Sequence, residues 1–117
     1  MDKFFESELR VLEVLWDKGE MSAGALAKKL AVFYGWNRNT TYTVVTKLVR
    51  KGLVEREDPG FLCRALVTRE EAQRQETENL ISRMFNGSRI QFLSAFLSGG
   101  ISDEEAKALR EMVEKLG

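Results

Sequence analysis

A stretch between residues 36 and 52 carries the side chains best suited to bind a polyanion. Its apolar positions recur with the period of an α-helix, so one face of that helix would pack in a core. The opposite face holds hydroxyls, amides and cations, and no carboxylate occurs between Arg38 and Lys51. Solvated faces commonly mix both signs of charge, whereas these groups contact phosphate oxygens and base edges. The pattern predicts a DNA-binding helix whose apolar face comprises Thr41, Val44, Val45 and Leu48.

From this helix and from the β-hairpin that follows it, whose tip would form a wing beside the phosphate backbone, we predict the residues that contact DNA. Asn39 and Thr43 are expected at base edges, and Thr40, Lys47 and Arg50 mainly at phosphates. The alternative interpretation is an ordinary solvated helix face. The complete predicted set is Asn39, Thr40, Tyr42, Thr43, Thr46, Lys47, Arg50, Arg56 and Arg64.

The distribution of charge supports a nucleic-acid partner although the net charge is zero. Residues 28–56 contain seven cations and a single anion, Glu55, whereas residues 71–117 contain six cations and eight anions. A local basic stripe on a neutral protein is an electrostatic footprint for a polyanion. We therefore expect double-stranded DNA as a partner.

The residue inventory argues against enzymatic chemistry. The chain has no histidine and a single cysteine, Cys63. This composition excludes an intrachain disulfide, a Cys/His zinc site and a Ser-His-Asp triad. We expect no catalytic residues, no cofactor and no metal, and we interpret Cys63 as a packing residue. Tyr42 has an alternative role in packing under the wing.

The chain has no apolar run near the roughly 18 to 20 residues needed to span a bilayer. Its N-terminus lacks a basic region followed by an apolar core, so no secretion signal is predicted. We expect a cytoplasmic protein without a membrane partner.

Helix caps and apolar periodicity predict three helices before residue 53. The first covers about residues 4–16, and Ser22 has the residue type and position of an N-cap for the second. The third is the polar helix described above, capped by Asn37 or Asn39 and closed at Gly52.

A β-hairpin is predicted directly after these helices. Its arms are residues 53–57 and 61–67, joined at residues 58–61 by a turn in which Pro and Gly favour type II geometry. Three helices followed by a hairpin is the order of a winged helix-turn-helix, whose third helix enters the major groove. The expected fold is mainly α with a small β-hairpin, and residues 1–69 form the DNA-binding domain.

Residues 70–117 are predicted to form helices that need a partner surface. Capping boxes begin at Thr68 and Ser102, and Ser88 can cap a helix between them. A piece of fewer than about 50 residues rarely buries a self-sufficient core. We expect this region to form a homodimer, and the alternative is that it completes a monomeric core. The predicted dimer interface is Leu80, Ile81, Met84, Phe85, Phe92, Leu93, Phe96, Leu109, Met112, Val113 and Leu116.

Three segments of the chain resemble the penicillinase-repressor family of bacterial regulators, the BlaI and MecI type. They are ELRVLEVLW at residues 8–16, NTTYTVVTKLVRKGLV at residues 39–54 and FLCRALVTREEA at residues 61–72. The resemblance implies a homodimeric repressor with an N-terminal winged helix and a C-terminal helical dimerisation region. It also implies palindromic operators upstream of resistance genes.

Two properties found in parts of this family can be compared with the sequence. Some members are inactivated by a sensor-linked protease that cuts an Asn-Phe bond in the penultimate helix. An ungapped match places Ser94 and Ala95 there, so this chain departs from that pattern. A copper-responsive branch carries a C-terminal cysteine cluster, whereas this chain ends Glu-Lys-Leu-Gly. We therefore expect no copper sensing.

Two other functions remain as alternatives to a dimeric repressor. One is a ligand-sensing regulator of the multidrug-response type. The other is a winged helix that serves only as a protein-interaction scaffold.

Overall fold

The computed structural model describes residues 3–117, and the chain divides into two compact units. The first unit ends at Thr77 and the second runs from Glu78 to Gly117, so the boundary falls within helix α4, Arg69–Phe85. The other elements of the first unit are α1 (Glu6–Lys18), β1 (Met21–Ser22), α2 (Ala23–Tyr34), α3 (Arg38–Arg50), β2 (Val54–Glu57) and β3 (Leu62–Ala65).

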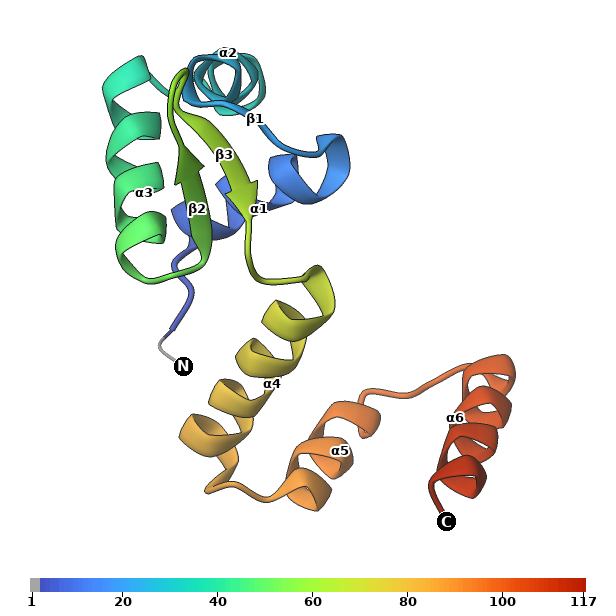
Figure 1. Ribbon diagram of the computed structural model, residues 1–117. Helices are drawn as coiled ribbons and strands as arrows, with labels where there is room; N and C mark the ends of the chain where they lie inside the picture. The colour runs from blue at the N-terminus through green and yellow to red at the C-terminus, as the bar shows by residue number, and fades with distance from the viewer. Residues whose placement is uncertain (1–2) are drawn as a thin grey trace. The chain divides into compact units, whose positions relative to one another are not determined.

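The first unit is a winged helix-turn-helix (Figure 1). Its strands form an antiparallel sheet in the order β1-β3-β2, and the β2–β3 hairpin lies beside α3. The predicted fold, mainly helical with a small hairpin, is therefore confirmed.

Local capping defines the helix-turn-helix. Ser22 Oγ accepts a hydrogen bond from Ala25 N–H at 3.1 Å, which begins α2. Gly35 has φ of 70° and ends α2, because a left-handed residue satisfies the last carbonyls of a helix. Asn37 Oδ1 then accepts from Thr40 N–H at 2.8 Å and begins α3. Of the two caps considered for α3, Asn37 is the one used.

The sheet contains one pairing that the sequence did not predict. The two residues of β1 pair with β3, Met21 with Cys63 and Ser22 with Leu62, and a strand this short has no periodicity to reveal it. The turn between the strands has one feature of the predicted type II geometry, because Gly60 at its third position has the positive φ that this turn requires, 92°. Phe61 at the fourth position also has a positive φ, 50°. The peptide bond between Asp58 and Pro59 is cis.

One apolar core holds the first unit together. Its helical positions come from the predicted faces, so the prediction that Thr41, Val44, Val45 and Leu48 of α3 point inward is confirmed. Their apolar partners are Val11, Leu12 and Leu15 of α1, Leu26 and Leu30 of α2, and Leu53, Val54 and Cys63 beside or within the hairpin.

Cys63 is a packing residue, as predicted. Its side chain is fully buried in the core, and burial raises the pKa of the thiol to about 11, although Arg56 opposes this shift. A thiol with this pKa stays protonated at neutral pH and is a poor nucleophile.

The second unit contains the end of α4 together with α5 (Arg89–Leu97) and α6 (Asp103–Leu116). The predicted caps are confirmed, because Ser88 accepts from Gln91 N–H at 3.1 Å and Ser102 accepts from Glu105 N–H at 3.0 Å. The return bond from Ser102 N–H lowers the pKa of the Glu105 carboxyl. Hydrogen bonds between residues close in the sequence therefore define where α5 and α6 begin.

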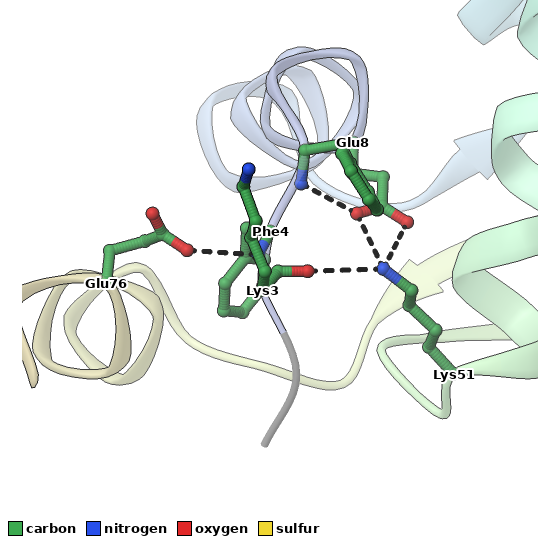
Figure 2. Close-up of polar contacts among 6 residues, drawn as sticks. Lys3, Phe4, Glu8, Lys51 and Glu76 are labelled. Atoms are coloured by element: carbon green, nitrogen blue, oxygen red, sulfur yellow. Dashed lines mark hydrogen bonds and ion pairs between the residues drawn. The ribbon is translucent and has the colours of Figure 1, made fainter. Parts of the chain in front are cut away.

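A buried carboxylate joins the start of α1 to the end of α3 (Figure 2). Glu8 is only 1% exposed, and its Oε1 accepts hydrogen bonds from Phe5 N–H and from Lys51 Nζ, both at 2.9 Å. Its Oε2 lies 2.8 Å from the same ammonium group, which also donates to the Lys3 carbonyl at 3.3 Å. The end of α3 is therefore fixed by an ion pair across 43 residues of sequence.

The segment before α1 also contacts α4. Phe4 N–H donates to Glu76 Oε1 at 3.0 Å, and the Phe4 side chain is buried in the core (Figure 2). Residues 3–5 thus contact both the end of α3 and α4 within the first unit.

The Glu8 ion pair gives a prediction about stability. Glu8→Ala leaves the Lys51 ammonium without its carboxylate, and breaking a buried pair is costly. Since the Lys51 side chain is 26% exposed, we expect a loss of about 2–3 kcal/mol in the free energy of unfolding, measured with urea. The control is Glu6→Ala, which removes an exposed pair with Arg10 and should cost less than about 0.5 kcal/mol. Equal losses in the two variants would contradict this account.

Candidate nucleic-acid interface

The polar face of α3 is exposed along its whole length. Asn39, Thr43, Thr46, Lys47 and Arg50 are exposed. The predicted contacts Thr40 and Tyr42 are half-buried. The core packing of the opposite face therefore brings most of the predicted contact residues onto one accessible surface.

Hydrogen bonds within α3 divide its hydroxyls into two kinds. Thr40 Oγ1 donates to Asn37 Oδ1 at 3.0 Å, and Thr46 Oγ1 donates to the Tyr42 carbonyl at 2.8 Å. Both hydroxyl protons are therefore already used in hydrogen bonds within the protein. The two oxygens can still accept a hydrogen bond from a base or a water. Within residues 3–117, Thr43 makes no side-chain hydrogen bond, so its hydroxyl can donate or accept.

The cations of the basic stripe also differ in their partners. Lys51 is paired with Glu8 and points toward the start of α1, so it does not belong to the polar face of α3. In the described part of the chain, Lys47 and Arg50 have no carboxylate within ion-pair distance. Their charges are available to phosphates.

The two predicted wing arginines are both engaged on the hairpin. The Arg56 guanidinium lies over the Phe61 ring at 3.7 Å and 3.4 Å from Asp58 Oδ1. Arg64 pairs with Glu55, its cross-strand neighbour in the antiparallel register. Both arginines remain about half exposed. Each therefore presents a charge that a neighbouring carboxylate reduces.

An aromatic contact joins the hairpin to α3. The Tyr42 and Phe61 rings meet edge to face, 5.5 Å between centroids and 79° between planes. The alternative prediction that Tyr42 packs under the wing is therefore correct as regards its ring. Its hydroxyl accepts a hydrogen bond from Arg38 Nη2 at 2.9 Å. Arg38 is not among the contacts predicted from the sequence, although the i,i+4 spacing of Arg38 and Tyr42 could have revealed this pair.

In the second unit, most of the predicted interface residues are exposed. Ile81 is buried, because it is only 4% exposed in the single chain. Phe85, Phe92 and Leu109 are half-buried, and Phe92 contacts Phe85 edge to face and stacks on Phe96. The exposed members are Leu80, Met84, Leu93, Phe96, Met112, Val113 and Leu116.

Within residues 3–117 the structure has neither a metal-binding cluster nor a membrane-spanning helix. No cluster of three or more histidine, cysteine, aspartate or glutamate side chains is arranged to hold a metal ion there. In the same part of the chain, no helix has the length and apolarity to cross a membrane.

Solved structures of winged-helix regulators resemble the chain. It matches Bacillus licheniformis BlaI, in its monomeric form with the blaP half-operator, with a TM-score of 0.52 and 21% identity. That match covers 60% of this chain and 88% of the BlaI chain in that structure. A MarR family protein from Bacillus stearothermophilus matches with a TM-score of 0.50 and 26% identity over 98% of this chain and 74% of that one.

Sequence comparison identifies the family. The methicillin resistance regulatory protein MecI of Mammaliicoccus sciuri is 23% identical over 93% of this chain and 91% of its own length. The family model described as penicillinase repressor matches residues 5–115, nearly the whole sequence. The family is one of transcriptional repressors and not of enzymes. The chain belongs to the penicillinase repressor family.

Proposed function

We propose that this protein is a transcriptional repressor that binds a palindromic DNA operator as a homodimer. The observation that carries the proposal is the exposed face of α3, which combines hydroxyls and amides with the unpaired cations Lys47 and Arg50. The similarity of the chain to BlaI, whose structure was solved with a half-operator, supports DNA as the ligand. Because DNA is the target, we place its action in the cytoplasm.

In this proposal α3 lies in the major groove, the usual position of the second helix of a helix-turn-helix. Asn39 and Thr43, whose side chains are exposed, contact base edges. Lys47 and Arg50 contact phosphates, and Thr40 does so by exchanging its bond to Asn37. The remaining residues that we propose to contact the DNA are Tyr42, Thr46, Arg56 and Arg64.

The exposed apolar surface of the second unit supports the proposed homodimer. Met112, Val113 and Leu116 recur on one face of α6 and are all more than half exposed. A second copy that covers such a surface would bury it and would supply a second α3, which doubles the operator read. We propose residues 1–69 as the DNA-binding domain and residues 70–117 as the dimerisation region.

A ligand-regulated repressor is the second candidate. The similarity to a MarR family protein spans 98% of the chain, and an apolar hollow of about 270 Å³ lies between α5 and α6. Its lining includes Phe96, Leu109 and Met112, which are also proposed dimer residues. A ligand there would therefore compete with, or act through, the dimer contact.

We do not extend the proposal to a sensor-linked protease. Ser94 and Ala95, both exposed on α5, occupy the position where the cleaved members of the family have an Asn-Phe bond. We therefore propose no proteolytic switch at this bond.

Loss of cations from α3 should weaken binding to every DNA sequence. In Lys47→Ala/Arg50→Ala, we expect the slope of log K against log salt to flatten by about 1.8, since each phosphate contact contributes about 0.9. Fluorescence anisotropy with a duplex selected from a random library, and with an unrelated duplex, measures both effects. Lys18→Ala/Arg74→Ala removes two cations outside α3 and serves as the control. Unchanged binding by the α3 variant would show that α3 is not the DNA-binding helix.

A carboxylate in the apolar face of α6 should separate the protomers. We expect the parent protein to sediment as a dimer and Val113→Asp to sediment as a monomer. The monomer should bind half of a palindromic site, with lower affinity than the parent has for the whole site. Analytical ultracentrifugation measures the mass. Lys107→Asp, on the exposed polar side of the same helix, should remain dimeric. A parent protein that is monomeric at micromolar concentration would refute the dimer.

A further inference from the structure

Three polar side-chain atoms converge over the start of α2. Gly24 is the second residue of α2, and a Cβ added there would lie 3.9 Å from Ser22 Oγ. The same point is 4.0 Å from Arg38 Nη2 and from Tyr42 Oη. Ser22 belongs to the cap of α2, whereas Arg38 and Tyr42 come from the first turns of α3. The helix-turn-helix therefore gathers these atoms around one open position.

The chemistry of this group suits an anion. Arg38 uses one N–H toward Tyr42 Oη, at 2.9 Å, and its other donors remain available. Tyr42 Oη accepts that bond, and Ser22 Oγ accepts from Ala25 N–H, so both hydroxyl protons are free to be donated. Among residues 3–117 no carboxylate forms an ion pair with Arg38, and the first turn of α2 contains no acidic residue.

The cation is held in place before any ligand arrives. The Arg38 guanidinium lies 5.1 Å from the centroid of the Tyr42 ring, and that ring also contacts Phe61 of the hairpin edge to face. Phe61 in turn lies under Arg56 at 3.7 Å. A side chain ordered in this way loses less conformational entropy on binding.

Internal packing does not explain the glycine at position 24. Glycine is less favourable than alanine within a helix, and a methyl group here would meet only ordinary van der Waals contacts. An alanine would therefore fit the chain itself. Glycine does have a use where a ligand approaches the backbone closely.

We propose that Arg38, Tyr42 and Ser22 bind a single phosphate of the DNA backbone, which approaches over Gly24. The inference rests on the proposed DNA-binding function and adds a second anchor to it, independent of Lys47 and Arg50. The planar guanidinium donates to the phosphate oxygens, and the two hydroxyls complete the set of donors. This anchor fixes the register of α3 in the groove and does not read sequence.

The first test removes the charge and then the hydroxyl. Arg38→Gln should weaken binding to selected and unrelated duplexes alike, by roughly fivefold to tenfold, and should flatten the salt slope by about 0.9. Tyr42→Phe keeps the ring on Phe61 and should weaken binding without changing the slope. The matched control is Arg10→Gln. Arg10 also stacks on a tyrosine, Tyr34, at 4.3 Å. It belongs to α1, however, and α1 packs against the buried face of α3. The slope of Arg10→Gln should equal that of the parent.

The second test uses Gly24. Gly24→Ala should keep or raise the melting temperature while it lowers DNA affinity several-fold, a combination that a damaged fold cannot produce. Undiminished affinity in Gly24→Ala, or an unchanged slope in Arg38→Gln, would overturn the inference while the parent protein still binds DNA. A parent protein that binds no duplex with a salt-dependent affinity would instead refute the proposed function itself.

Discussion

The carboxylate of Glu8 imposes the constraint on which the placement of α3 depends. It lies in the interior, where an unpaired charge would be strongly destabilising, and so it requires a cation at a fixed position. Lys51 meets that requirement from the residue just after α3, while Phe5 N–H binds the same oxygen. The end of α3 therefore cannot slide along α1 without breaking the pair. Apolar packing alone would tolerate such a shift more easily, because dispersion contacts have little directionality.

The opposite end of α3 is fixed by different means. Asn37 caps the first turn, and Tyr42 packs against Phe61 of the hairpin. Between these two ends the buried positions repeat with helical spacing, so the rotation of the helix about its axis is also determined. With position and rotation both fixed, the side chains between Asn39 and Arg50 are presented as one ordered surface. Such preorganisation favours the binding of a rigid partner such as a duplex.

The features that depend on residues close in the sequence could be predicted from the sequence alone. The caps at Ser22, Ser88 and Ser102 lie within three positions of their partners, and the inward face of α3 follows from its period. Contacts between distant residues were not predictable from one sequence, because no local pattern records them. The Glu8–Lys51 pair and the β1–β3 pairing are of this kind. For the same reason Lys51 was counted with the basic stripe, although its charge is used inside the fold.

The pairing of carboxylates explains how a protein of zero net charge can present a positive surface. Glu13 and Asp17 of α1 both bind Arg69, at 3.0 and 2.6 Å, and Glu78 binds Arg89 at 2.7 Å. These ion pairs lie outside α3, and in each of them an arginine offsets the negative charge of the carboxylate. Within the described residues no acidic side chain pairs with Lys47, Arg50 or Arg38. At physiological salt, charges beyond about 8 Å are largely screened, so a duplex against α3 would experience these local cations and not the net charge.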